Sequence, residues 1–267
     1  MRKARRSARA KAIALALILS GALAITATAA TIQRDNLRIT VLSQILPFKL
    51  PREKPAPIAV FISGHIATPS GAVPPQLQRM SVKVNRHGLL QSKGLPTCQL
   101  PQIQPGSSER ALANCADALV GSGRFWAQIV LPDQRPYPTR GRLLVFNGRV
   151  SGKPVLFAHI YTTIPFASSF VITFAISHPR DPVYGTELNA SLPQALGDWG
   201  FVDRIKLTLK RKYRYLGKSL SYFNAACPAL KGTMSASFPL ARASFYFGGH
   251  KPITLGVQKS CRVGKAP

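Results

Sequence analysis

The stretch VLFAHIY at residues 155–161 and its neighbour FVITFAI at residues 170–176 decide the fold class. Both are rich in β-branched and aromatic residues, with apolar side chains at odd and even positions alike, which is typical of strands covered on both faces. Turn residues separate further runs of this kind, at 59–66, 80–84, 125–131, 142–146, 205–209, 238–247 and 253–257. The sequence therefore predicts an all-β fold, an antiparallel sandwich or open barrel.

One segment has helical spacing. Between Ser107 and Gly121, the side chains of Leu112, Cys115 and Leu119 recur on one helix face, and Ser107 can cap the helix N-terminus. We therefore predict one short helix over residues 107–121. The glycines at 121 and 123 follow this helix rather than precede one, so we interpret them as its cap and turn and not as a phosphate-binding loop.

The four cysteines are an even number, which in an exported chain favours disulfides. Sequence alone allows three pairings. The short separations favour Cys98 with Cys115 and Cys227 with Cys261. None of the four has another Cys or a His within four residues, so we expect no metal site.

The N-terminus has the composition of a targeting segment. Six basic residues precede an uncharged apolar stretch at 13–25, and Ala27, Thr28 and Ala29 form a small-x-small cleavage site. We predict a signal peptide over residues 1–30 and a secreted or cell-surface protein. Because residues 12–30 carry no charge, an uncleaved N-terminal helix that anchors the chain is the alternative.

The mature chain divides at a proline-rich segment. Residues 31–56 read as a lead-in and a Pro-rich linker, with prolines at 47, 51 and 55 and charged residues between them. Residues 57–263 then form a single β-sandwich-like domain, for which two smaller β domains are the alternative.

The chain is strongly basic. It has 36 Lys and Arg against 9 Asp and Glu, a formal charge of +27, and removal of the six basic residues of the signal peptide leaves +21. A surface of this charge attracts polyanions, although no specific nucleic-acid-binding motif is present.

The clearest charge pattern runs from residue 204 to residue 215, where basic residues alternate with mostly apolar ones. On a strand these would occupy opposite faces. One interpretation is a solvated outer face that also discourages edge pairing. The other is a contact surface for an anionic cell-envelope polymer or lipid headgroups, with binding residues Arg204, Lys206, Lys210, Lys212 and Arg214.

Catalytic motifs are absent from the sequence: it contains no G-x-S-x-G, H-E-x-x-H, P-loop or dinucleotide fingerprint, and we expect no cofactor. His159 alternates with apolar residues and reads as a core histidine, while His178 and Asp181 lie in a proline-rich turn. The sequence favours a binding protein over an enzyme. The alternatives are an exported hydrolase whose site is assembled from distant residues, and a structural cell-surface module.

Three segments carry a family resemblance: GLPTC at 94–98, ALANC at 111–115 leading into ALVGSG at 118–123, and Cys227-Pro228 before a C-terminal Cys261. Together they resemble a group of exported all-β proteins of the actinobacterial type. The resemblance covers residues 57–263 and supports the same disulfide pairing. It implies no activity and carries over no functional residue.

Overall fold

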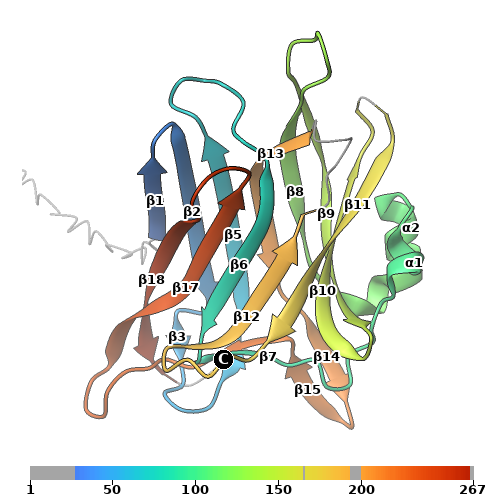
Figure 1. The fold of residues 1–267 in the computed structure, drawn as a ribbon. Coiled ribbons are helices and arrows are strands. Elements are labelled where there is room, and N and C mark those ends of the chain that lie inside the picture. The colour runs from blue at the N-terminus through green and yellow to red at the C-terminus, as the bar shows by residue number, and fades with distance from the viewer. Residues whose placement is uncertain (1–27, 165, 193–199, 265–267) are drawn as a thin grey trace, which may run out of the picture.

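The main body of the protein is one long β-sheet that curves into a half-barrel, as the computed structural model in Figure 1 shows. The structure describes residues 28–164, 166–192 and 200–264. The thirteen strands of this sheet follow the spatial order β1-β2-β5-β13-β8-β9-β10-β11-β12-β6-β17-β18-β3. The all-β prediction is confirmed. Its neighbouring strands are antiparallel except for β3, which joins β18 in parallel.

Two small sheets complete the β structure, one of β14 and β15 and one of β4, β16 and β7. The strands are β1 (Thr28–Arg34), β2 (Leu37–Leu46), β3 (Lys49–Leu50), β4 (Ala56–Pro57), β5 (Ala59–Ala67), β6 (Leu77–Asn85), β7 (Gly88–Leu90), β8 (Leu119–Ile129), β9 (Tyr137–Val150), β10 (Lys153–Thr162), β11 (Ser168–Ser177), β12 (Tyr184–Ser191), β13 (Gly200–Leu209), β14 (Lys212–Tyr215), β15 (Lys218–Ser221), β16 (Phe223–Ala225), β17 (Ser235–Phe247) and β18 (Ile253–Val263).

The inside of the half-barrel is apolar. Strands from the two ends of the sheet face each other there, so that Ile39 of β2 packs in one cluster with Phe245 of β17 and Leu255 of β18. Further along, Phe125 of β8 and Ile160 of β10 continue the same inner face. Alternate residues of these strands consequently point outward, and they include the basic residues of β13.

Two helices cover part of the outer face (Figure 1), namely α1 (Leu100–Ile103) and α2 (Ser108–Cys115), followed by the 3-10 turn η1 (Ala116–Ala118). They bury Leu144, Phe146 and Phe157 of β9 and β10. Ser107 caps α2 as predicted, with its hydroxyl accepting the backbone N–H of Arg110. The predicted end at residue 121 is wrong, because the chain enters β8 at Leu119.

The glycines that follow are strand residues, which corrects their interpretation as a cap and turn. Gly123 lies opposite Leu207 of β13, and Gly121 lies opposite Leu209. A Cβ at Gly123 would sit 2.0 Å from the Lys206 carbonyl oxygen, so only glycine permits this close approach of β8 and β13.

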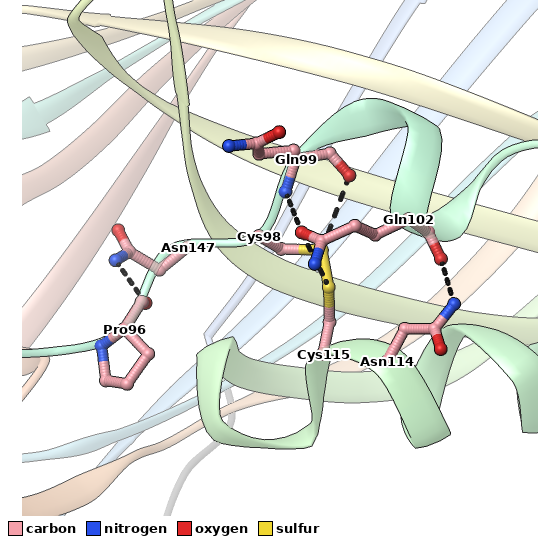
Figure 2. Close-up of a disulfide and its surroundings, with 7 residues drawn as sticks. All are labelled: Pro96, Cys98, Gln99, Gln102, Asn114, Cys115 and Asn147. Carbon is pink, nitrogen blue, oxygen red and sulfur yellow. Dashed lines mark hydrogen bonds between the residues drawn. A yellow bond between two sulfur atoms is a disulfide. The ribbon is translucent and has the colours of Figure 1, made fainter.

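Both predicted disulfides are present. Cys98–Cys115 ties α2 to the segment before α1, and Figure 2 shows how hydrogen bonds surround it. The Gln102 side chain accepts the backbone N–H of Gln99 at 2.7 Å, while the Gln102 carbonyl accepts the Asn114 amide at 2.7 Å. The helical segment is therefore fixed to the sheet both covalently and by polar contacts.

Cys227–Cys261 ties the loop before β17 to β18. The same loop is held from the Pro-rich segment, where the Arg52 guanidinium donates to the carbonyls of Ala229, Leu230 and Thr233. Residues 47–57 are thus a strap along the sheet, and they contribute β3 and β4.

Residues 28–46 form β1 and β2 of the main sheet, and β2 pairs along its length with β5. From the sequence, residues 31–46 are expected to form a lead-in before the domain. The sheet thus begins before residue 57, where the sequence placed the domain boundary. Residues 1–27 of the predicted signal peptide lie outside the described residues.

Candidate functional site

The five predicted binding residues are all exposed, but they do not lie on one strand. Arg204 and Lys206 belong to β13, which ends at Leu209, and Lys212 and Arg214 belong to the separate hairpin of β14 and β15. A continuous strand over 204–215 is therefore wrong. The break comes at Lys210 and Arg211, where the Arg211 guanidinium donates to the Asp117 carbonyl at 3.1 Å.

The inward residues of the hairpin pack as the alternation predicts. The Tyr213 hydroxyl donates to the carbonyls of Gln91 and Lys93, and the ring of Tyr215 lies against Gly94, where a Cβ would be 2.1 Å from the ring. Both tyrosines thus anchor the hairpin to the body of the protein.

Strand register brings further cations beside Arg204 and Lys206. Lys206 lies directly opposite Arg124 of β8, and Arg124 lies directly opposite Arg142 of β9. In the neighbouring row, Trp126 lies between Arg204 and Arg140. These six residues, which we call the basic face, are Arg124, Trp126, Arg140, Arg142, Arg204 and Lys206.

The basic face is electrostatically unfavourable in the protein alone. Neighbouring strands are about 4.8 Å apart, so three cations stand side by side in the row of Lys206, Arg124 and Arg142. Like charges directly opposite each other destabilise a sheet. Over the described residues, the one ion pair joins Lys83 to Asp181 at 4.0 Å, so carboxylates do not neutralise this row.

Two acidic residues near the basic face, Asp203 and Glu109, form hydrogen bonds with groups outside it. Asp203, next to Arg204 in the chain, accepts a hydrogen bond from the Gln128 side chain at 3.1 Å. Glu109 lies in the first turn of α2, where its own backbone N–H and the Ser107 hydroxyl lower its pKa, with a smaller contribution from Arg142. The positive charge of Arg142 therefore stabilises the Glu109 carboxylate, although the two residues do not form an ion pair.

Trp126 gives the basic face an aromatic surface. The Arg204 guanidinium carbon lies 5.8 Å from the centre of a Trp126 ring, within the range of a cation–π contact. This contact holds the long Arg204 side chain over β8.

A shallow groove of about 420 Å³ adjoins the basic face. It crosses the outer face of four strands because small side chains, Ser63 and Ser122, lie between the larger ones of Phe61 and Trp126. Lys206 and Arg124 also line it. The groove thus combines apolar walls with the positive charges of Lys206 and Arg124.

Two glycines precede arginines of the basic face, one in β8 and one in β9. Gly123 precedes Arg124 and Gly141 precedes Arg142, and both glycines point to the inner face. A Cβ at Gly141 would lie 1.9 Å from the Tyr161 carbonyl oxygen. Without inner side chains the strands approach closely at this point, while the arginines that follow the glycines point outward.

Sequence reasoning missed Arg124, Arg140 and Arg142. Each lies far from residue 204 in the chain, and only the register of β13, β8 and β9 brings them together. The sequence does contain a weak pattern of the same kind. Arg140 and Arg142 are two residues apart in β9, and Arg124 and Trp126 are two residues apart in β8, so each pair lies on one face of its strand.

The three residues considered for catalysis all make structural hydrogen bonds, and His178 donates through Nδ1 to the Gly185 carbonyl at 3.1 Å. His159 is fully buried, and its Nε2 donates to the Gly106 carbonyl at 3.0 Å, as a core histidine does. Burial lowers its pKa, so the ring is held neutral. Asp181 accepts the backbone N–H groups of Val183 and Tyr184, which orders the turn after β11.

Comparison with family models, with curated proteins and with solved structures finds no match. Within residues 28–164, 166–192 and 200–264, no helix is long and apolar enough to cross a membrane.

Proposed function

We propose that the protein is an exported binding protein that holds an anionic polymer of the cell envelope against the basic face. The observation that carries this proposal is the row of Lys206, Arg124 and Arg142, three adjacent cations with no carboxylate between them. An anionic ligand would relieve their mutual repulsion, so binding would be coupled to a gain in stability.

The shape of the surface favours a polymer over a small anion. The basic face is open and extends across the three strands β13, β8 and β9, whereas a site for a small anion would enclose the anion. Cations repeat about every 4.8 Å across the strands and about every 6.5–7 Å along β13, so successive charges of a chain-like ligand meet successive side chains. The Trp126 ring offers a flat apolar surface beside them for uncharged or ring portions of that ligand.

A protein that binds a cell-envelope polymer must lie outside the cytoplasm, and the two disulfides are consistent with that location. Two disulfides indicate an oxidising compartment outside the cytoplasm. The signal peptide, and with it secretion or display at the cell surface, is part of the proposal.

The experiment compares two triple variants with equal loss of charge. Arg124→Gln, Arg142→Gln and Lys206→Gln together should weaken binding to long-chain polyphosphate and lower the slope of log affinity against log salt by about two to three, since each contact releases roughly one counterion. The control carries Lys93→Gln, Lys153→Gln and Lys251→Gln, three exposed cations outside the basic face. Equal weakening in both variants would refute a specific site and leave only general attraction by a basic protein.

A further inference from the structure

The tip of the hairpin of β14 and β15 has an unusual residue. Leu216 and Gly217 form its two-residue turn with positive φ angles of 49° and 73°. Glycine, asparagine and aspartate adopt this left-handed conformation readily, whereas leucine does so at a cost. Leu216 is also 80 % exposed, so packing within the protein does not compensate for that cost. In the equivalent turn between β9 and β10, a serine, Ser151, occupies this position.

A second segment presents apolar side chains to solvent in the same way. In the loop 228–234, Leu230 is 77 % exposed and Met234 is 66 % exposed. The loop is nevertheless well held, by the Cys227–Cys261 disulfide, by Arg52, and by the hydrogen bond from the Val263 N–H to the Met234 carbonyl at 2.9 Å. These apolar side chains are therefore displayed on a rigid support.

The two segments lie at the same end of the half-barrel. The antiparallel pairing places the end of β13, the start of β10 and the start of β17 at one end, and the hairpin follows β13 while the loop precedes β17. Figure 1 shows both projecting at the lower end, below β3 and β7. We call this the docking end, consisting of residues 210–221 and 228–234.

Positive charges surround the exposed apolar tips. Lys212, Arg214 and Lys218 are exposed on the hairpin, and Lys231 is exposed next to Leu230 in the loop. Neither segment contains an Asp or a Glu. Apolar side chains flanked by unneutralised cations are complementary to a membrane surface with anionic lipids, since the apolar groups enter the interface and the cations contact the headgroups.

We propose that the docking end binds the surface of a membrane containing anionic phospholipid, with Leu216, Leu230 and Met234 entering the interface. This surface is separate from the basic face, so the inference does not rest on the proposed function. The protein would then lie end-on to the membrane, with the half-barrel extending away from it and the basic face along its side.

Vesicle co-sedimentation tests this proposal, with vesicles of phosphatidylcholine alone or mixed with phosphatidylglycerol. The protein should bind the mixed vesicles and not the neutral ones. Leu216→Asn should weaken this binding about tenfold by removing one inserted apolar side chain. Asparagine suits the left-handed turn, so the variant should unfold at the same temperature or higher. Folding therefore cannot explain the loss.

Two further variants separate the possible outcomes. Ile164→Ser removes an apolar side chain that is 51 % exposed in the connection between β10 and β11, at the opposite end, and should bind as wild type does. Replacement of Lys212, Arg214, Lys218 and Lys231 by Gln should abolish the preference for phosphatidylglycerol. If wild type does not bind the mixed vesicles, or if Leu216→Asn and Ile164→Ser bind equally, the proposal is wrong.

Soluble polyphosphate distinguishes the two surfaces. Leu216→Asn should bind it as wild type does, whereas the basic-face triple variant should lose that binding and still bind the mixed vesicles. Vesicle binding without polyphosphate binding would overturn the proposed function and leave the docking end intact.

Discussion

Arg124 of β8 and Arg142 of β9 lie directly opposite each other on the outer face of the half-barrel. Lys206 of β13 continues the same row on the other side of Arg124. Sheets ordinarily place opposite charges or neutral residues at such positions, because like charges there reduce stability. Under the function proposed above, an anionic ligand would relieve this repulsion and stabilise the folded protein.

Replacing one of these arginines should therefore stabilise the free protein. We expect Arg142→Thr to raise the free energy of unfolding by about 0.5 kcal/mol, through the lost repulsion and the strand preference of threonine. Urea denaturation at low salt measures this, and the gain should shrink at high salt as the charges are screened. A loss of stability at low salt would show that the row is not repulsive.

The two disulfides should contribute comparably to stability. Their loops span 17 and 34 residues. In the chain-entropy model, Cys98→Ser with Cys115→Ser should cost about 3 kcal/mol, and Cys227→Ser with Cys261→Ser about 4 kcal/mol. Guanidinium denaturation of the two double variants provides the comparison. A cost near zero for either pair would mean that the surrounding hydrogen bonds and the Arg52 contacts fix that segment without the covalent bond.

His159 should make the protein sensitive to mild acid. Burial lowers its pKa below the usual 6.5, so the unfolded chain takes up a proton at a higher pH than the folded protein. The contribution of His159 to the free energy of unfolding therefore has its full value above pH 6.5. It decreases as the pH falls toward the folded-state pKa of His159, by at most about 1.4 kcal/mol per pH unit. His159→Gln should flatten the urea midpoint between pH 7 and pH 5.5. An unchanged pH profile would assign the acid sensitivity to other groups.

The fold class was predictable from the sequence because its signals are local. Runs such as 155–161 predict strands, and the cysteine separations favoured the correct pairs. The end of α2 was not predictable from periodicity, because Leu119 suits both a helix face and the first residue of β8. The position of β1 and β2 in the main sheet was equally hidden, since it depends on pairing with β5 and facing β17 across the interior.

The candidate site was only partly predictable for the same reason. Alternation identified Arg204 and Lys206 as outward-facing, which the structure confirms. It could not reveal the strand break at Lys210, because the break is fixed by contacts with Asp117 and with the segment around Lys93. Nor could it reveal Arg124 and Arg142, which become neighbours only through the order β13-β8-β9.

Cleavage of the signal peptide can be tested on exported protein. We expect a mature chain that begins at Ala30 or Thr31, which would shorten β1 but keep the pairs from Thr31 with Thr40 to Arg34 with Leu37. Intact-mass measurement decides this directly. A mass that retains the basic N-terminal residues would support an uncleaved anchor instead.

Mapping of backbone amide shifts by NMR during titration with polyphosphate tests the basic face most directly. We predict that the largest shifts fall in three segments that are distant in sequence, around Arg124 to Trp126, Arg140 to Arg142 and Arg204 to Lys206. Arg124→Gln with Arg142→Gln should remove them together. Shifts confined to the hairpin 210–218, or spread evenly over all basic residues, would contradict a binding site at this face.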